Sequence, residues 1–494
     1  MDGNITLKAS LECTDGRSVI VPCKVYLPKL PMGKPYFIFS PKKDQFNILS
    51  KIRNVNFKAS IDGFNSKNEI TLSSPVVWLS GKNTRHWGPY FSESCLKGEP
   101  QGLKIVEKIG LSSQDSGKAH LRIWVSPNAY LNPEISPEFS YTGDVTYNRH
   151  DQIECKVSDN LSIKFDRNFK YLNKSKTTLI QHSYLVAYAE ISPEYILNEA
   201  VDEEIFGPID MLLKLASLGS RTRTACLGFD AELYDQIITI YRSNLSYPSG
   251  KSEFMINCAF PDDFKDSPHT EGLVDREYFP DFLFTSLNNI KTKSNPKIIL
   301  DAINSVVPGK VRTLEESFLS MFSNFEALLL DFRKSHNLEY VVNDEGLWAI
   351  KKEKIKKAIK TIFNDCTKEK RSFIYSKIDE LNRIPLRIAY DKFCMYYHLD
   401  NTDLWPIFNE NNNIGLVEIR NRLIHGVKIS SKFIHMFSVS KECMQYTVER
   451  MLLKMLGFQL EKTDVSKSII LHEQYRAKWS NEEMVKFKNY MECL

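Results

Sequence analysis

The 494-residue chain has no uninterrupted run of about 18 apolar residues, the shortest helix that crosses a bilayer. Its first residues, MDGNITLKAS, lack the basic and then apolar order of a secretory signal. Apolar residues at 42% and charged residues at 26% exclude a largely disordered chain. We therefore expect a cytoplasmic protein of roughly two or three domains that does not enter the membrane.

The ten cysteines form no recognisable motif. They are scattered singly between Cys13 and Cys493, without a Cys-x-x-Cys pair, and no two histidines have the spacing of zinc ligands. We interpret them as reduced, mostly buried thiols, and we expect neither a metal nor another cofactor. The formal net charge is only +4, so the charge of the whole chain does not require a nucleic-acid partner. A surface that binds nucleic acid would have to be local.

Residues 1–195 are typical of a β-rich domain. Runs such as SVIVPCKVYL, PYFIFS, AHLRIWVS and TTLIQHSYLVAYAEI are separated by turn sequences such as PMGKP and SPNAYLNPEISP. Residues 196–308 continue this N-terminal region with mixed α/β patterns, including a helix that ends near Gly219. The dipeptide formed by Pro308 and Gly309 then interrupts the chain, and we place the main domain boundary there.

Almost every segment of residues 309–458 has helical spacing. Thr313 and Glu316 form the sequence pattern of a capping box at the start of the first long helix. The apolar stripe of that helix consists of Phe318, Phe322, Phe325, Leu329 and Phe332. We expect a helical bundle here, followed by a C-terminal tail, residues 459–494, that docks as a strand and a helix. The predicted fold class is α+β and multidomain.

Residues 418–429, EIRNRLIHGVKI, place polar side chains beside a buried helical stripe. On a helix Asn421 and His425 share one edge, whereas Arg420 lies about 140° around the axis from His425. Gly426 has the position of a residue that ends a helix, which puts His425 at the negative end of the helix dipole. The dipole favours a protonated imidazole and the arginines favour a neutral one, so we expect proton exchange near neutral pH. Guanidinium groups beside such an imidazole would suit a phosphate.

The same residues also fit a polar helix end with a capping histidine and two solvated arginines. Arg420, Asn421 and His425, followed by Gly426, resemble the motif of HEPN-domain ribonucleases, in which Arg and a polar residue precede His by a fixed spacing. FSNFEALLLDF, IDELNRIPLRIAYDKF and VERMLLKMLGF resemble helical segments of such domains. The architecture is most similar to that of the ApeA-type HEPN proteins of bacterial phage defence, which have a long β-rich region before the bundle.

This resemblance implies a metal-independent endoribonuclease in which the motifs of a homodimer face each other through the HEPN bundle. His425 would transfer protons as an RNA 2′-hydroxyl attacks the adjacent phosphate, Arg420 would stabilise that phosphate, and Asn421 would orient either group. The ends produced would be a 2′,3′-cyclic phosphate and a 5′-hydroxyl, and DNA would not be cut.

The resemblance also implies a role as a toxic effector in antiviral defence by abortive infection. The substrate would be tRNA or another cellular RNA. Because a constitutively active RNase would poison its own cell, we expect the N-terminal region to sense a trigger, such as a phage-derived product, or to restrain the nuclease. Two alternatives remain open: a non-catalytic HEPN module that binds RNA or nucleotides or dimerises, and an enzyme whose active site lies in the N-terminal region.

Further residues have supporting roles in this hypothesis. Glu326 lies within the apolar stripe, where an unpaired carboxylate would be costly, so we expect it to pair with an arginine near the motif. A carboxylate at the wet margin of the stripe is the alternative. Arg422 is a second supporting candidate. The candidate RNA-binding residues are Lys351, Lys352, Lys354, Lys356 and Lys357. A solvated helix face explains this basic segment equally well.

Overall fold

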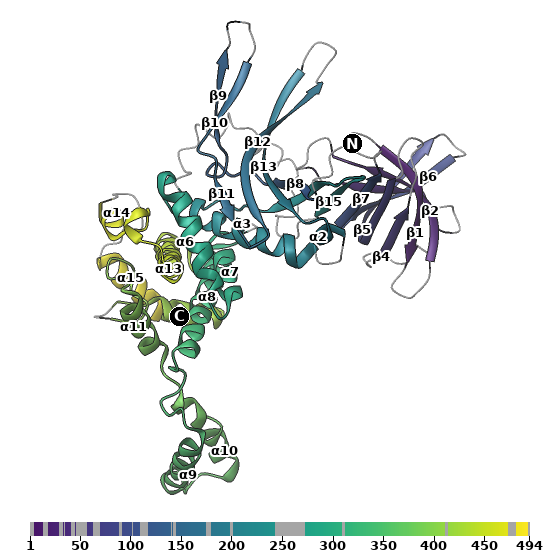
Figure 1. The fold of residues 1–494 in the computed structure, drawn as a ribbon. Helices are drawn as coiled ribbons and strands as arrows, with labels where there is room; N and C mark the ends of the chain where they lie inside the picture. Colours follow the sequence, from purple (N-terminus) through teal and green to yellow (C-terminus); the bar gives the residue numbers. More distant parts are fainter. Residues whose placement is uncertain are drawn as a thin grey trace. The chain divides into compact units, whose positions relative to one another are not determined.

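Strands dominate the chain as far as Arg242, and helices dominate it from Phe279 onward (Figure 1). The computed structural model describes residues 4–12, 18–28, 33, 35–40, 45, 57–62, 70–87, 91–100, 102–108, 117–139, 141, 145–173, 179–197, 201–242, 272–308, 312–410, 413–472 and 481–492. The chain divides into two units, Met1–Gly272 and Leu273–Leu494. A β-rich region followed by a helical region confirms the predicted α+β class.

The described elements of the first unit are its strands and three helical elements. Its strands are β1 (Asn4–Glu12), β2 (Ser18–Tyr26), β3 (Tyr36–Phe39), β4 (Phe57–Asp62), β5 (Ile70–Trp87), β6 (Phe91–Pro100), β7 (Gly102–Lys108), β8 (Ala119–Val125), β9 (Glu134–Phe139), β10 (Val145–His150), β11 (Glu154–Lys156), β12 (Ser162–Asn173), β13 (Leu179–Ile191), β14 (Cys226–Glu232) and β15 (Gln236–Arg242). Its helical elements are α2 (Glu194–Leu197), η1 (Asp202–Phe206) and α3 (Gly207–Ser220). The predicted runs SVIVPCKVYL, PYFIFS, AHLRIWVS and TTLIQHSYLVAYAEI are present as β2, β3, β8 and β13. The sequence does not predict every strand. Among those missed are β6 and β9, in which glycine, proline and charged residues interrupt the apolar alternation, and β9 includes the end of SPNAYLNPEISP, which we expected to be a turn.

The long strand β5 joins two parts of the main sheet. In the described residues the order is β11-β12-β13-β8-β14-β15-β7-β5-β4-β1-β2-β3-β6, and β6 also pairs with β5. Six strands, β5-β4-β1-β2-β3-β6, therefore close into a ring of antiparallel pairs. The alternating side chains of β2 and β3 that are buried in this ring are Val21, Cys23, Val25, Phe37 and Phe39. Burial raises the pKa of the Cys23 thiol to about 12.

The rest of the sheet is open and has α3 packed on β14. Phe229 of β14 is fully buried and its ring lies 5.4 Å from that of Phe206. Alternate residues of the same strands face the opposite side, where Trp124 of β8 lies against Gly228. A Cβ at Gly228 would lie 2.0 Å from the Ile240 carbonyl oxygen and 3.1 Å from the Trp124 ring, so this position requires glycine.

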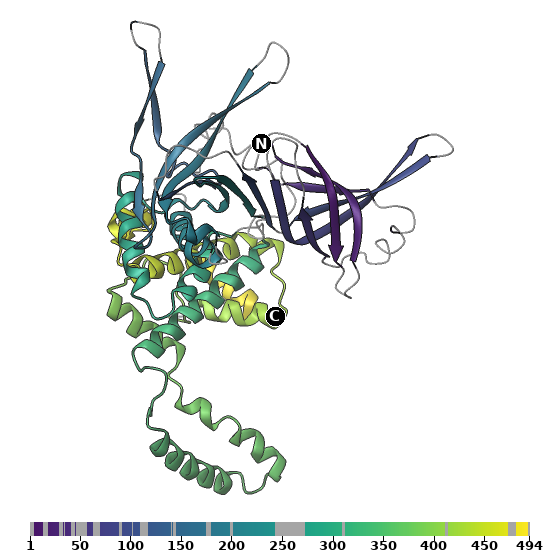
Figure 2. The same cartoon turned by 45° about the vertical axis from the view of Figure 1, so that its right-hand side comes forward.

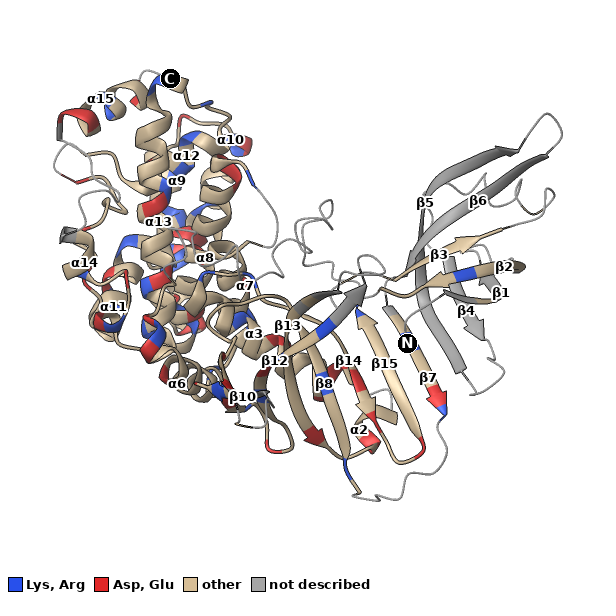
Figure 3. Ribbon diagram, turned by 90° about the horizontal axis from the view of Figure 1, so that it is seen from above, with Lys and Arg blue, Asp and Glu red and all other residues tan. Residues whose placement is uncertain are grey.

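The second unit is helical. Its elements are η2 (Arg276–Tyr278), α6 (Phe279–Lys291), α7 (Pro296–Val306), α8 (Leu314–Ser335), α9 (Glu345–Ile362), α10 (Lys368–Tyr375), η3 (Ile378–Asn382), α11 (Leu386–Tyr397), α12 (Leu416–Ile424), η4 (Ser431–Phe433), α13 (Ile434–Met455), η5 (Leu460–Lys462), α14 (Lys467–His472) and α15 (Asn481–Glu492). Lys and Arg are interspersed with Asp and Glu along these helices (Figure 3). None of the helices within the described ranges has the length and apolar content that crossing a membrane requires.

Helix α8 is the centre of this unit and packs against α7, α11, α12 and α13. Both halves of the predicted capping box are formed, because Thr313 accepts from the Glu316 backbone and Glu316 accepts from the Thr313 backbone. The predicted stripe is confirmed, since every residue assigned to it is buried. The division between the units lies earlier than the boundary we predicted at Pro308, because α7 packs on α8 and α13 and belongs to the helical unit. Gly309 lies outside the described residues.

Helices α9 and α10 form an arm that extends from the bundle in both views (Figures 1 and 2). Neither helix has a buried residue. The two chain segments at the base of the arm pair with each other, through the bridge between Tyr340 and Arg383 and the hydrogen bond from Val341 N to Asn382 O at 2.7 Å. The arm is therefore attached by backbone pairing rather than by a hydrophobic core.

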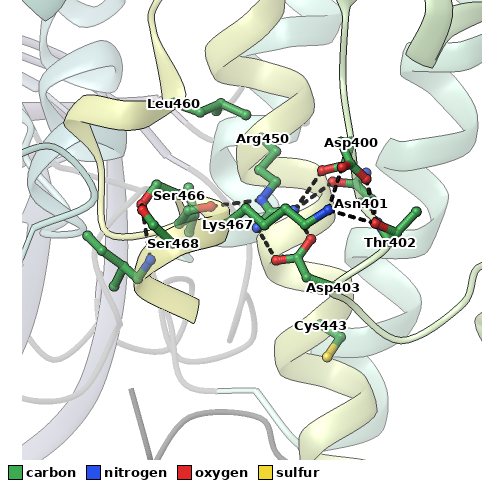
Figure 4. Close-up of polar contacts among 12 residues, drawn as sticks. Asp400, Asn401, Thr402, Asp403, Cys443, Arg450, Leu460, Ser466, Lys467 and Ser468 are labelled. Atoms are coloured by element: carbon green, nitrogen blue, oxygen red, sulfur yellow. Dashed lines mark hydrogen bonds and ion pairs between the residues drawn. The ribbon is translucent and has the colours of Figure 1, made fainter. Parts of the chain in front are cut away.

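A buried ion pair joins α13 to segments on either side of it in the sequence (Figure 4). Arg450 of α13 is 0% exposed and donates to both carboxylate oxygens of Asp403, at 2.8 and 2.6 Å. Its remaining donors reach the Val465 carbonyl at 2.8 Å and the Asp400 carbonyl at 3.0 Å. Lys467 and Thr402 hold the pKa of the Asp400 carboxyl well below its usual range. One arginine thus connects α13, the segment before α12 and the tail.

We expect the Arg450→Met substitution to lower the free energy of unfolding by about 3–5 kcal/mol, because it leaves the Asp403 carboxylate buried without its partner. The Lys467→Met variant removes a half-exposed ion pair with Asp400 and should cost at most about 1 kcal/mol. Denaturant unfolding of both variants measures the difference. Equal destabilisation by the two substitutions would contradict the larger contribution that we assign to the buried pair of Arg450 and Asp403.

Candidate active site

Helix α12 begins against the segment that precedes it. The backbone N–H groups of Leu416 and Val417 donate to the carbonyls of Pro406 and Ile407, both at 2.9 Å, so the first turn is satisfied by the loop. Nearby, the Trp405 indole donates to the Ile414 carbonyl at 2.8 Å. The buried residues of the helix are Leu416, Ile419 and Leu423, as the sequence predicts. The helix packs with this stripe on the bundle, and its polar residues lie beside the stripe.

The helix ends at the predicted glycine. Gly426 has a φ of +86°, its N–H donates to the Leu423 carbonyl at 3.0 Å, and the Val427 N–H donates to the Arg422 carbonyl at 3.1 Å. These two hydrogen bonds form a Schellman motif with Gly426 at C′ and His425 at the C-cap. His425 therefore lies at the carbonyl end of the helix.

Arg420 is held in place by three neighbours. Its Nη2 donates to Glu326 Oε2 of α8 at 3.1 Å, and its Nη1 donates to Asn421 Oδ1 at 3.1 Å. Its guanidinium carbon lies 5.7 Å from the centre of the Phe322 ring. The side chains of Arg420 and Glu326 are 31% and 36% exposed, so solvent reaches the pair. The expected pairing of Glu326 with an arginine near the motif is therefore present, with Arg420 as the arginine.

His425 and Arg422 are separate from this pair. His425 is exposed, and within the described part of the chain its imidazole makes no hydrogen bond or ion pair. Its backbone N–H donates to the Asn421 carbonyl at 3.1 Å, which places the two residues one turn apart as predicted. Arg422 donates to Glu418 at 2.8 Å on the same helix. The structure therefore brings together Arg420, Asn421 and Glu326, and it leaves His425 open to solvent at the helix end.

The candidate RNA-binding lysines lie on α9 in the arm, where the helix packs against α10 and η3. Two of them are paired with acids: Lys352 with Asp379, and Lys356 with Glu353 at 2.6 Å. The exposed lysines on the other side of α9 are Lys351, Lys354, Lys357 and Lys360. The arm therefore presents a narrower cationic face than the sequence suggested.

Three residues of the site were missed from the sequence. Phe322 stacks on Arg420, and it precedes Glu326 by one helical turn, which could have indicated the contact. Glu418 precedes Arg422 by four residues, the usual spacing of a helical ion pair. Tyr490 of α15 bonds the segment that follows Gly426, and nothing in the local sequence pattern signals that contact.

No protein-family model, curated protein or solved structure matches this chain.

We expect the Gly426→Ala substitution to destabilise the second unit by about 1–2 kcal/mol, because a Cβ disfavours the positive φ at C′. Apart from its chain neighbours, no atom of the described residues lies within 4 Å of the added Cβ, so we attribute the cost to the backbone conformation. Thermal unfolding measures the effect, and Gly346→Ala, at a glycine without a positive φ, is the control. A cost at Gly426 no greater than the cost at Gly346 would contradict this explanation.

Proposed function

We propose that the chain is a metal-independent endoribonuclease of the HEPN type, with Arg420, Asn421 and His425 as its catalytic residues. The observation that supports this best is a guanidinium that is oriented by Glu326 and Asn421, on the same helix whose C-terminal end carries an exposed imidazole. The two groups supply what cleavage of RNA by its own 2′-hydroxyl needs, a cation for the phosphate and a group that exchanges protons.

In the proposed reaction, the 2′-oxygen forms a bond to phosphorus and the bond from phosphorus to the 5′-oxygen breaks. His425 takes the 2′-hydroxyl proton, and a proton is delivered to the leaving 5′-oxygen. Arg420 stabilises the negative charge that develops on the non-bridging oxygens. Of the five N–H donors of a guanidinium, two are used by Asn421 and Glu326, so the others are available to a phosphate.

A homodimer would complete this site. Residues five apart on a helix point about 140° away from each other, and Arg420 is turned towards α8 while His425 is exposed. Within one copy, the imidazole and the guanidinium of Arg420 therefore point in different directions. The His425 of a second copy, placed opposite the first, would supply the acid for the leaving group.

We further propose that the first unit senses a phage-derived trigger or restrains the nuclease. Its open sheet has a cavity of about 200 Å³ whose lining includes Arg122, Trp124 and Asp230. The Arg122 Nε donates to Asp230 Oδ2 at 3.2 Å, and Thr239 donates to Asp230 Oδ1 at 2.8 Å. An oriented charged pair can position a small polar ligand or a single side chain. This cavity supports a sensing role.

The second candidate is a non-catalytic HEPN module that binds RNA or nucleotides or dimerises. The ion pair of Arg420 with Glu326 favours it, because such a pair also stabilises a helical bundle without any chemistry. In that case His425 would be a solvated helix cap. Activity measurements distinguish the two candidates.

We expect the purified protein to cleave RNA in the presence of a chelator, and we expect His425→Ala and Arg420→Ala each to reduce kcat/KM by at least about 100-fold. His435→Ala, at an exposed histidine of α13, is the matched control and should retain activity. RNA fragments with 2′,3′-cyclic phosphate ends would support the reaction. Cleavage at parental rates by both motif variants would overturn it.

We expect the exposed lysines of α9 to contribute to RNA affinity through phosphate contacts. The Lys354→Gln/Lys357→Gln double variant should weaken RNA binding and lower the salt dependence by about 1.4 units of slope, at about 0.7 per phosphate on a single strand. Lys352→Gln/Lys356→Gln removes the same charge from lysines already paired with acids. Titration of labelled RNA at several salt concentrations compares the two. Equal losses of affinity would contradict a specific role for the exposed face.

A further inference from the structure

The tail contacts the chain on both sides of α12. Helix α15 buries Met484, Phe487 and Met491 against the bundle. The Phe487 ring lies 6.1 Å from that of Trp405, edge to face, and 5.9 Å from that of Phe433. Trp405 precedes α12 and Phe433 follows it. One face of α15 therefore spans the two segments that lead into and out of the motif helix.

The Tyr490 hydroxyl makes two hydrogen bonds to the segment that follows Gly426. It accepts from the Ser430 N–H at 2.9 Å and donates to the Lys428 carbonyl at 3.0 Å. Its ring is stacked on Phe433, with the centres 4.4 Å apart and the planes 24° from parallel. The hydroxyl thus satisfies one backbone N–H and one backbone carbonyl, as a neighbouring strand would in a sheet.

This segment has few other fixed points. Val427 is tied to the helix end by its N–H, and Ser430 begins η4 by capping it. In this segment, the Lys428 carbonyl and the Ser430 N–H each have Tyr490 as their only hydrogen-bond partner within the described residues. The path of the chain as it leaves the His425 turn is therefore set mainly by one side chain of the tail.

We propose that Tyr490 is a positioning residue that fixes the turn carrying His425, an inference that rests on the proposed nuclease function. Arg420 and Asn421 lie one turn earlier and are held by α8 through Glu326, so they do not depend on Tyr490. The imidazole lies at the end of the helix, next to the segment that Tyr490 holds. Loss of the hydroxyl should therefore impair the proton transfers of His425 and leave the phosphate contact of Arg420 unchanged.

The test uses the full-length chain with Tyr490→Phe, which keeps the stacked ring and removes both hydrogen bonds. Asn489→Ala, at the neighbouring exposed residue of α15, is the matched control. We expect the Ser430 amide of the Tyr490→Phe variant to exchange with solvent about tenfold faster than in the parent. Amide exchange within α13 should be unchanged, which shows that the bundle remains folded.

With RNA as substrate, we expect Tyr490→Phe to lower kcat by about tenfold to 100-fold, since small displacements of a reacting group are costly, and to leave KM within about twofold of the parent. An unchanged kcat, or a rise in KM alone, would overturn the positioning role. A parent protein that cuts no RNA would overturn the nuclease function instead. In that case the exchange measurement still shows whether Tyr490 orders the turn.

Discussion

The ion pair of Arg450 and Asp403 is the constraint on which the second unit depends. Removing two charges from water is expensive, and the cost is offset only because the guanidinium reaches the carbonyls of Val465 and Asp400 as well as the carboxylate. These groups come from the helix, the loop and the tail, so the interaction exists only when all three have reached their final positions. It specifies the arrangement that presents α12.

The amino-acid pattern predicts what is local and periodic. The stripe and capping box of α8, the buried face of α12 and the terminating role of Gly426 all follow from spacing on one helix. The boundary between the units cannot be predicted from local spacing. The dipeptide after α7 favours a boundary at that point, whereas the packing of α7 on α8, which assigns α7 to the second unit, depends on tertiary contacts. The partner of Arg420 follows in part, since a carboxylate at Glu326 within an apolar stripe requires a cation but does not identify it. Tyr490 lies about sixty residues from its hydrogen-bond partners in the sequence, and a contact at that separation produces no periodic pattern.

The polar residues of the motif helix differ in the way they are supported. Arg420 is half-buried and oriented from α8, so its position is set by the core of the bundle. His425 is exposed at a turn whose exit is held by the tail. A catalytic site with one rigid and one peripheral component could be regulated through the peripheral one without loss of the fold. The separation of the two groups is thus the property of this site that most affects how it would work.

The pairing of β5 with β6 has a consequence for solubility. A sheet normally exposes two outer strands, and each is a template on which other chains can add and aggregate. Because the ring closes on itself, the main sheet has one outer strand within the described residues, β11. That strand is only three residues long, Glu154–Lys156, and it carries a glutamate and a lysine. Closure of the ring thus removes one end strand as a site for aggregation, and the backbone that stays unpaired on one side includes the parts of β12 and β13 beyond the residues that pair with β11 and β8.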